Sequence, residues 1–261
     1  MVCIPNQLSN EILKKIKLVR NPKKIHSFLL ACQKREKEAI EKNAQIESYR
    51  IENPHCSIPH NVPRNNRNIK NGIKNIQNAF RWGKQNFNPE NIDESFIRNL
   101  AYQIMPCLYE GKHIADYRDV NVLITGSDFM PPYPWKVENM EIPQFFQNIK
   151  EHLTSDNIFE NMETAFYAHF NIVRIHPFLD GNGRTARTFQ DILLDHYGIP
   201  LPVIEAGERM TYYQFLEDAV CGYKDRNSEG SHFVSEGEKK FYTYMAGKVN
   251  VSLDKVLNSC K

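Results

Sequence analysis

The segment from Ile175 to Arg187 places an imidazole, a carboxylate, a glycine-rich turn and two guanidinium groups in one short run. Pro177 biases His176 away from helical backbone angles, so a helix is expected to end there. The stretch Gly181–Gly183 permits a tight turn, and the residues after it favour a helix. The sequence therefore predicts a helix, a loop and a second helix, with loop N–H groups at the start of the second helix.

This arrangement is suited to anions, because free N–H groups and the positive end of a helix dipole favour phosphate. Arg184 and Arg187 share a helix face, and guanidinium groups bind phosphate oxygens in pairs. Asp180 fits beside phosphate when Mg²⁺ lies between them, since Mg²⁺ takes one or two carboxylates together with phosphate oxygens and water. His176 is a candidate general base near neutral pH. These residues predict a site for Mg²⁺ and a nucleotide, with a base directed at a phosphorus atom.

The run reads HPFLDGNGRTAR and matches every fixed position of HPFx[DE]GNGRxxR, the signature of the Fic family, which this chain therefore resembles. Fic proteins typically transfer AMP from ATP to a Ser, Thr or Tyr hydroxyl of a target protein. The resemblance implies that His176 is the base, that Asp180 is the Mg²⁺ ligand and that Phe178 anchors the loop in the core. It also implies a set of phosphate-binding residues, namely Gly181, Asn182, Gly183, Arg184 and Arg187.

Other activities stay open within the same family. Some relatives remove AMP, and others transfer phosphocholine, UMP or phosphate. Gly183 argues against phosphate transfer, because the Doc-type kinases carry lysine at this position. A non-catalytic binding module or an antitoxin-like regulator is the alternative of another class, and the intact His176 and Asp180 argue against it.

A second motif lies upstream, at residues 44–54. Ser48, Glu52 and Asn53 occupy the fixed positions of [ST]xxxE[GN], which resembles the inhibitory helix of many Fic proteins. Glu52 is expected to pair with Arg187 and to occupy the space of the ATP γ-phosphate. Ser48 is expected to hydrogen-bond near Asn182. The alternative is an ordinary helix that ends at Asn53-Pro54.

The composition is that of an ordinary globular chain. The 261 residues suffice for one large domain with extensions. A net charge of +2 gives no case for nucleic acid or a membrane as partner. The six cysteines contain no Cys-x-x-Cys pair, so free thiols in a reducing cytoplasm are expected. The start lacks a secretory pattern, and no apolar run could span a bilayer. Formation of a homodimer stays open.

Hydrophobic spacing and breaker residues predict an almost all-helical fold. Besides the motif helix, the expected helices are 8–19, 23–45, 69–85, 93–108, 137–153, 158–172, 210–220 and 238–257. Residues 117–126 are β-branched and alternating, which predicts one small hairpin. It resembles the Fic flap, which pairs with a target segment as an added strand. Leu123, Ile124 and Thr125 are the candidate target contacts, and a purely structural hairpin is the alternative.

We expect three regions along the chain. They are an N-terminal helical region at 1–67 with the inhibitory helix at about 40–54, a Fic core at 68–219 and a C-terminal helical extension at 220–261. His169 is expected to be a hydrogen-bonded core residue rather than a metal ligand. The resemblance places Tyr213 at the adenine pocket, with a buried structural tyrosine as the alternative. Val220 stands where some relatives have asparagine, so nucleotide selectivity stays open.

Overall fold

The computed structural model describes residues 3–20, 27–53, 67–124, 127, 129–153, 156–231 and 233–259. Helices dominate these residues and no strand occurs among them, which confirms the all-α prediction. The longer helices are α1 (Asn6–Arg20), α2 (Ser27–Glu52), α3 (Arg67–Asn86), α4 (Glu94–Ile104), α6 (Ile142–His152), α7 (Ile158–Ile175), α8 (Asn182–His196), α9 (Arg209–Ser228) and α10 (Glu236–Asn258). Short helical turns are η2 (Pro106–Leu108), α5 (Pro134–Lys136), the π-helical η3 (Val137–Glu141) and η4 (Ala206–Glu208).

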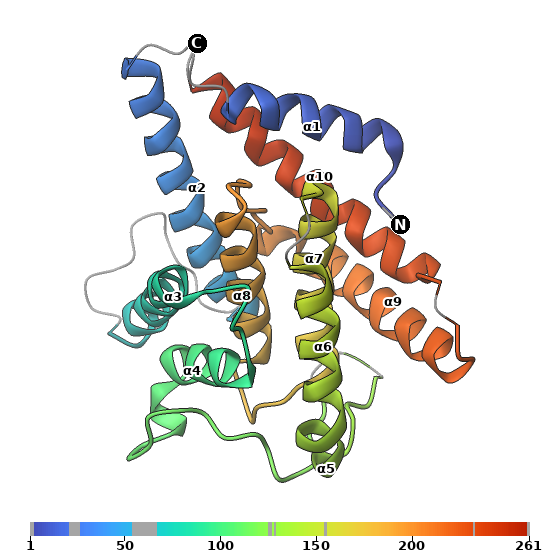
Figure 1. Ribbon diagram of the computed structural model, residues 1–261. Helices are drawn as coiled ribbons and strands as arrows, with labels where there is room; N and C mark the ends of the chain where they lie inside the picture. Colours follow the sequence, from blue (N-terminus) through green and yellow to red (C-terminus); the bar gives the residue numbers. More distant parts are fainter. Residues whose placement is uncertain are drawn as a thin grey trace.

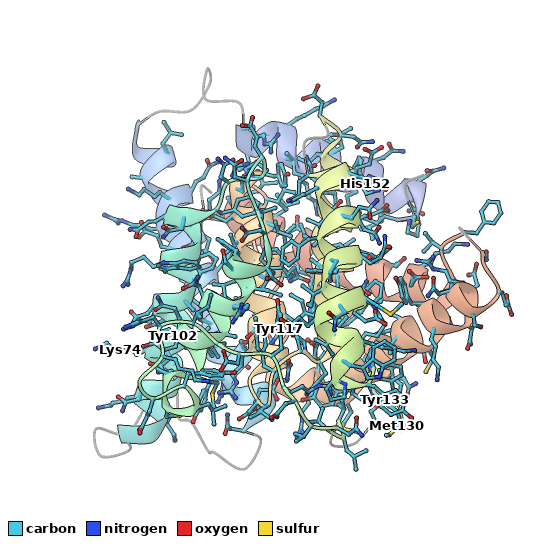
Figure 2. All side chains as sticks on the ribbon, turned by 60° about the horizontal axis from the view of Figure 1, so that its bottom comes forward. Lys74, Tyr102, Tyr117, Met130, Tyr133 and His152 are labelled. Carbon is cyan, nitrogen blue, oxygen red and sulfur yellow. The ribbon has the colours of Figure 1, made fainter. Side chains whose placement is uncertain are left out.

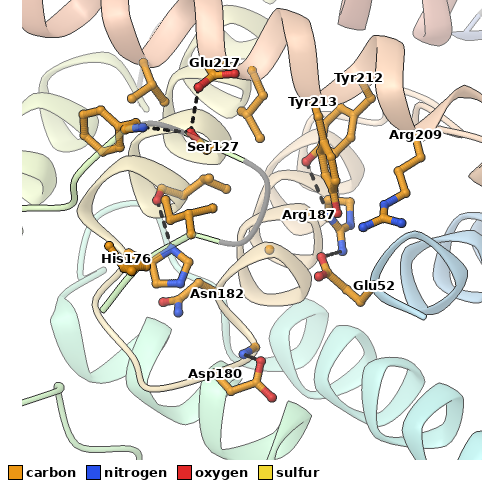
Figure 3. A pocket seen from close by; sticks show the side chains of 18 of the residues that line it. Glu52, Ser127, His176, Asp180, Asn182, Arg187, Arg209, Tyr212, Tyr213 and Glu217 are labelled. Carbon is orange, nitrogen blue, oxygen red and sulfur yellow. Dashed lines mark hydrogen bonds and ion pairs between the residues drawn. The ribbon is translucent and has the colours of Figure 1, made fainter. Parts of the chain in front are cut away.

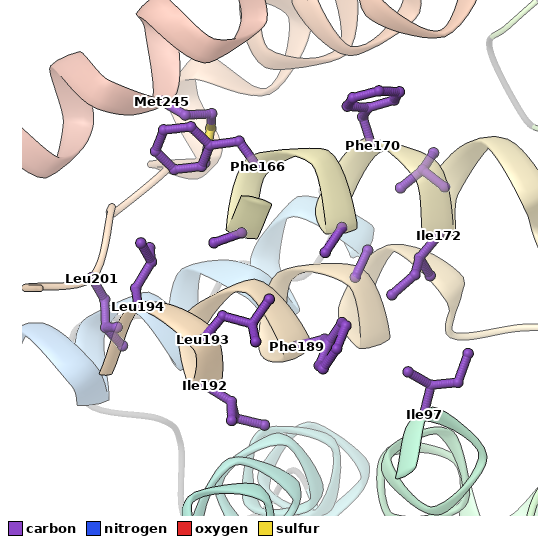
Figure 4. Close-up of a cluster of buried hydrophobic side chains, with 14 of the residues drawn as sticks. Ile97, Phe166, Phe170, Ile172, Phe189, Ile192, Leu193, Leu194, Leu201 and Met245 are labelled. Atoms are coloured by element: carbon purple, nitrogen blue, oxygen red, sulfur yellow. The ribbon is translucent and has the colours of Figure 1, made fainter. Parts of the chain in front are cut away.

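The core is built on the pair α7 and α8, which flank the motif loop and pack against each other along their lengths. Helix α8 also contacts α2, α3 and α4, so it lies inside the bundle (Figure 1). Figure 4 shows Phe189 of α8 pointing toward Ile172 of α7 and Ile97 of α4, and all three side chains are fully buried. Truncating a buried Phe of this kind typically costs about 3–5 kcal/mol. The motif loop is therefore held between two helices whose facing side chains are buried.

Local signals explain where these helices begin. Asp93 accepts a hydrogen bond from the N–H of Ser95 and so caps α4, and Asn157 caps α7 in the same way. Ser235 and Glu238 form a reciprocal capping box at the start of α10. These caps satisfy N–H groups that a helix start leaves without partners.

The two chain ends are packed into one body with the motif helices. Helix α1 lies along α10, and α2 contacts α3, α8 and α10 (Figure 1). The predicted inhibitory segment is the last part of α2, which runs as a single helix to Glu52. None of the helices in the described residues combines the length and apolar character needed to cross a bilayer.

The segment that precedes α5 crosses one end of the bundle, where Figure 2 labels Tyr117, Met130 and Tyr133. Residues 117–124 are described and contain no strand, so the predicted hairpin is not seen in them. Thr125 and Gly126, at its predicted turn, lie outside the described residues. Here hydrogen bonds to the motif loop, described below, take the place of strand pairing.

Helix boundaries depart from the predictions at several points, for example at the end of α2, which reaches Glu52 instead of residue 45. The predicted helix 93–108 is divided at Met105, after which Pro106 begins the separate turn η2. Helix α9 continues to Ser228, beyond its predicted end at Val220. Packing against α10 stabilises this continuation.

Candidate active site

The motif loop opens on a cavity of about 390 Å³. Figure 3 shows His176 and Asp180 on one side of it, and Glu52, Arg187 and Arg209 on the other. Asn182 and the glycines that flank it also line the cavity. A cavity of this size accommodates a small-molecule ligand. Residues from α2, α7, α8 and α9 therefore meet at one site.

His176 ends α7 in the left-handed region, with φ 50° and ψ 57°. It is the one non-glycine residue with positive φ among those the structure describes. Such a conformation is costly for a residue with a Cβ and persists only where neighbours enforce it. The helix stop expected before Pro177 is thus confirmed, but His176 adopts the left-handed conformation rather than an extended one.

The protonation state of His176 follows from its surroundings. Burial lowers the pKa of the imidazole, and the charge of Arg118 lowers it further. Nδ1 lies 3.2 Å from the carbonyl oxygen of Val173. Because a carbonyl can only accept, Nδ1 carries the hydrogen and Nε2 carries the free lone pair. The neutral ring thus leaves a basic nitrogen available.

The turn after His176 is held by Asn182, whose side chain is buried. Its Oδ1 accepts from the N–H of Phe178 at 2.9 Å, and its Nδ2 donates to the carbonyl of Phe178 at 2.8 Å. Phe178 is fully buried, which confirms it as an anchor. Gly181 has φ 81°, and an added Cβ would lie 2.8 Å from Met105 Cγ, so the turn needs glycine for both conformation and space. Helix α8 begins at the next residue, with its first turn at the cavity.

Asp180 is the exposed carboxylate of this loop, with 59% of its side chain accessible. Its Oδ1 lies 3.2 Å from Nη2 of Arg184 and accepts from the N–H of Gly181. Arg184 is buried, and its Nε finds no hydrogen-bond partner among the described residues. A buried donor without a partner is unusual, and an anion bound at the loop would supply one.

Arg187 is the most heavily bonded cation of the site. Its Nε donates to Ser48 Oγ at 2.9 Å, and its Nη2 donates to the Ser48 carbonyl at 3.1 Å and to Glu52 Oε1 at 2.6 Å. Burial alone would raise the pKa of Glu52, but the charge of Arg187 and its hydrogen bond outweigh burial and lower that pKa. The expected Glu52–Arg187 contact is present. Ser48 bonds Arg187 rather than lying on Asn182, whose amide is taken by the Phe178 backbone.

Asn53 ends the inhibitory helix. Its N–H donates to the carbonyl of Arg50 at 3.1 Å, and its side-chain amide donates to the carbonyl of Tyr49 at 2.9 Å. Two carbonyls of the last turn are thereby satisfied, in the manner of a helix C-cap. Asn53 thus fixes the end of α2, from which Glu52 extends to the cavity.

Behind Arg187, a chain of hydrogen bonds runs through the core. Nη1 of Arg187 donates to the hydroxyl of Tyr212 at 3.3 Å, and this hydroxyl lies 2.7 Å from Nε2 of His169. His169 Nδ1 lies 2.7 Å from Oε1 of Gln190. Since Oε1 only accepts, Nδ1 donates, and Tyr212 must donate to Nε2. Burial lowers the pKa of His169 to about 3, so the ring is neutral. His169 is therefore a hydrogen-bonded core residue, as expected.

The wall opposite the loop comes from α9. Tyr213, Leu216, Glu217 and Val220 line the cavity there. Tyr212 is the fully buried member of the tyrosine pair, whereas Tyr213 is partly exposed, with its ring 5.1 Å from the guanidinium carbon of Arg209. Leu123, which is 75% exposed, and Ile124 line the cavity from the segment before α5. Thr125, the third predicted flap contact, lies outside the described residues.

Comparison with known families agrees with this geometry, since residues 91–194 match the model of the Fic/DOC family. Residues 91–194 are thus the part of the chain that is similar to the Fic/DOC family. The match falls inside the predicted core at 68–219, although the division into three regions stays a prediction.

Two relatives of the Fic domain show how far the sequence similarity extends. A protein named protein adenylyltransferase Fic, from Drosophila persimilis, is 49% identical over 143 residues, which is 50% of this chain and 27% of that protein. Protein adenylyltransferase fic-1 of Caenorhabditis elegans is 34% identical over 112 residues, which is 43% of this chain and 21% of that protein. Both matches thus cover less than a third of the relative's own length.

Solved structures show that the similarity in fold extends over nearly the whole chain. A Fic domain containing signaling protein from Bacteroides thetaiotaomicron has a TM-score of 0.73 at 21% identity, and the match covers 97% of each chain. Fic-1 of Caenorhabditis elegans has a TM-score of 0.69 at 17% identity, covering 97% of this chain and 71% of that one. These matches confirm the Fic fold.

Three residues around the Fic motif were not predicted from the sequence. Arg118 is buried and bonds the backbone of the motif loop. Tyr212 holds Arg187 from behind, and Arg209 lines the cavity with a buried Nε that finds no partner in the described part of the chain. No short motif surrounds any of them. Of the three, only Tyr212 could have been found from the sequence, because it precedes Tyr213, which the resemblance places at the adenine pocket.

Proposed function

We propose that this chain is a protein adenylyltransferase, which transfers AMP from ATP to a hydroxyl side chain of a target protein and is held at low activity by Glu52. One observation carries the proposal. The basic nitrogen of His176, the first turn of α8 and the Glu52–Arg187 ion pair line a single cavity. The names of the sequence relatives support the choice of AMP as the transferred group.

The phosphates are bound by the start of α8 and by three guanidinium groups. The N–H groups of Asn182 and Gly183 and the helix dipole favour negative charge at this point, and Gly181 provides the turn that precedes them. Arg184, Arg187 and Arg209 supply charge-assisted donors. Tyr213 and the apolar side chains of α9 offer a wall for the nucleobase. Arg209, whose Nε has no partner among the described residues, lines the cavity and is available to a bound triphosphate.

Asp180 is the residue that would hold Mg²⁺. No cluster of three or more His, Cys, Asp or Glu side chains suited to a metal occurs among the described residues. A single carboxylate nevertheless fits Mg²⁺, which keeps several waters and takes its remaining ligands from substrate phosphates. When bound, the ion offsets the negative charge of the triphosphate.

In the transfer step, the target hydroxyl attacks the α-phosphorus of ATP. The bond from this phosphorus to the pyrophosphate oxygen breaks, and the proton of the hydroxyl passes to Nε2 of His176. A neutral hydroxyl is a weak nucleophile, so a positioned base accelerates the attack. Charge that develops on the phosphorus-bound oxygens faces the preorganised N–H groups of the loop.

Inhibition follows from competition for Arg187. Glu52 Oε1 already occupies Nη2 of Arg187, and its lowered pKa keeps it ionised at neutral pH. A γ-phosphate would have to displace this carboxylate or lie elsewhere. ATP bound beside an intact ion pair would thus have its phosphates misplaced for in-line attack.

The target is expected to be a protein with an accessible hydroxyl in an extended segment. Leu123, Ile124 and Thr125 are our candidate contacts for that segment. Among the similar folds is IbpAFic2, which has been solved in complex with adenylylated Cdc42. This supports a protein substrate for the fold without naming the target of this chain.

The experiment compares AMP incorporation by the wild-type chain and by Glu52→Gly, with ATP labelled at the α-phosphate, in a cell lysate and in the purified protein alone. Glu52→Gly should incorporate more label, and His176→Ala in that background should abolish it. Glu41→Gly, on the same helix but paired with Lys84, is the matched control and should behave as wild type. ATP labelled at the γ-phosphate should leave no label on protein. No gain from Glu52→Gly would show that the inhibitory assignment is wrong.

Removal of AMP is the second candidate, because Glu52 and His176 line the same cavity. An ionised carboxylate there could position a water molecule against an AMP-modified hydroxyl. Purified AMP-modified target incubated with Mg²⁺ separates the two activities. Loss of AMP with the wild-type chain but not with Glu52→Gly would favour removal as the resting activity.

A further inference from the structure

Arg118 carries a charge into the core beside the motif loop. The residue is 3% exposed, and its side chain donates to four backbone carbonyls. Nε reaches the His176 carbonyl at 2.7 Å, Nη1 reaches Val120 at 2.9 Å, and Nη2 reaches Pro132 at 2.5 Å and Ile175 at 3.4 Å. No carboxylate is among these partners, so within the described residues carbonyl dipoles compensate the buried charge.

Two of these carbonyls belong to the end of α7. A helix leaves its last carbonyls without intrahelical partners, and a cation at this end also complements the helix dipole. The backbone of residue 118 adds a further bond, because its N–H donates to the Pro177 carbonyl at 2.9 Å. The strained residue His176 therefore has its own carbonyl and both neighbouring carbonyls bonded to Arg118.

The other two carbonyls, of Val120 and Pro132, flank the segment that carries Leu123 and Ile124 to the cavity. One guanidinium group thus connects both ends of this segment to the backbone of His176. Tyr117 reinforces the connection, since its ring packs on Phe178 with centroids 5.8 Å apart.

We propose that Arg118 is a positioning residue for adenylyl transfer, which fixes the His176 backbone and the target-facing segment in one mutual arrangement. The inference rests on the proposed function. Arg118 does not line the nucleotide cavity, so it acts on the alignment of base and acceptor and not on ATP binding. Removing its donors leaves the backbone of His176 without these hydrogen bonds. A displacement of the imidazole by about 1 Å from the reacting hydroxyl can reduce the transfer rate by about 100-fold.

The test uses the full chain with Glu52→Gly, to which Arg118→Met is added. Methionine keeps the apolar stem and removes every donor. The matched control is Arg174→Met, because Arg174 is also buried and bonds Glu141 and Asn171, away from the cavity. Transfer rate, ATP affinity by calorimetry and thermal unfolding are measured for each variant. The titration of the His176 imidazole is followed by NMR.

Arg118→Met should lower the transfer rate by about 100-fold while ATP affinity changes less than about 3-fold, and should shift the His176 titration. Arg174→Met should lose thermal stability but retain both the rate and the titration. Arg118→Lys, which restores a cation with fewer donors, should recover part of the transfer rate. If Arg118→Met does not fold, Arg118→Lys takes its place and should show a reduced transfer rate with a nearly unchanged ATP affinity.

The proposal is overturned if Arg118→Met transfers AMP as fast as Arg174→Met, or if its rate and ATP affinity fall together. A Glu52→Gly chain that transfers no AMP at all would instead contradict the proposed function. In that case the His176 titration still decides whether Arg118 positions the imidazole.

Discussion

The carboxylate of Glu52 occupies the space that a side chain on Gly183 would fill. A Cβ built on Gly183 would collide with Oε1 of Glu52 and lie 3.2 Å from Nη1 of Arg187. The carboxylate of α2 thus reaches Arg187 because the first turn of α8 has no side chain at this point. The inhibitory contact and the phosphate-binding turn are fitted to each other at one glycine.

Gly183→Ala should therefore destabilise the chain by about 1 kcal/mol, since Glu52 must move away from its partner. In a Glu52→Ala background, the same substitution should cost close to nothing. Urea unfolding of the four proteins gives the coupling energy. Equal costs of Gly183→Ala in both backgrounds would show that Glu52 is not the group it displaces.

Tyr212→Phe removes the hydroxyl that accepts from Arg187 and donates to His169. It leaves Nε2 of a fully buried histidine without a donor, which typically costs about 1–3 kcal/mol. The free energy of unfolding should fall by that amount in denaturant titrations. Tyr213→Phe is the control on the next residue and should change stability by less than about 0.5 kcal/mol.

Asp191 should make stability fall with rising pH in the range between the pKa of an ordinary carboxyl and about 8. Burial raises the pKa of Asp191 to about 8, against 3.8 for an ordinary carboxyl. Between these values the folded chain keeps a proton that the unfolded chain has lost, so the free energy of unfolding falls as pH rises and levels off above about 8. Asp191→Asn should remove a decrease of about 1–2 kcal/mol between pH 6.5 and 8.

Titration of the neighbouring His169 does not contribute to the change in unfolding free energy between pH 6.5 and 8. Its folded pKa lies near 3, and an unfolded histidine titrates near 6.5. The stability that His169 contributes as a neutral ring is thus constant above about pH 6.5 and is lost only as pH falls below that value. A decrease that persists in Asp191→Asn between pH 6.5 and 8 would exclude Asp191 as its source.

The sequence predicted those parts of the site that are contiguous in the chain. His176, Asp180 and the turn before α8 were found because short-range spacing fixes them. Glu52 was found through its own local motif, and its contact with Arg187 joins residues 135 positions apart. Arg118 and Arg209 were missed because their roles arise only from packing. The hairpin was predicted from β-branched alternation, which cannot show that Arg118 would occupy the carbonyls of Val120 and Pro132.

Arg209 should contribute to binding of the triphosphate and not to binding of the nucleobase. It lies over Tyr213, and its charge, like those of Arg187 and Arg184, lowers the pKa of Glu52. Arg209→Met in a Glu52→Gly background should weaken ATP binding by about 10-fold, the loss expected for one charge-assisted hydrogen bond. Binding of AMP should change less than about 3-fold.

The control for this comparison is Arg81→Met, at an exposed arginine of α3. Calorimetric titrations with AMP, ADP and ATP should give identical affinities for this control and its parent. A uniform loss for all three nucleotides in Arg209→Met would instead indicate that Arg209 only supports the ring of Tyr213.

The pH dependence of transfer tests His176 as the base. Burial holds the pKa of His176 below 6.5, and the negative charge of Glu52 partly opposes this by raising it. The acid limb of kcat/KM should therefore have its midpoint below pH 6.5, because the ring stays neutral until the pH falls through its own pKa. Removing Glu52 removes the opposing charge, so the limb of Glu52→Gly should lie at lower pH than that of the wild-type chain. A limb that moves to higher pH on removal of Glu52 would mean that the titrating group is not an imidazole facing this carboxylate.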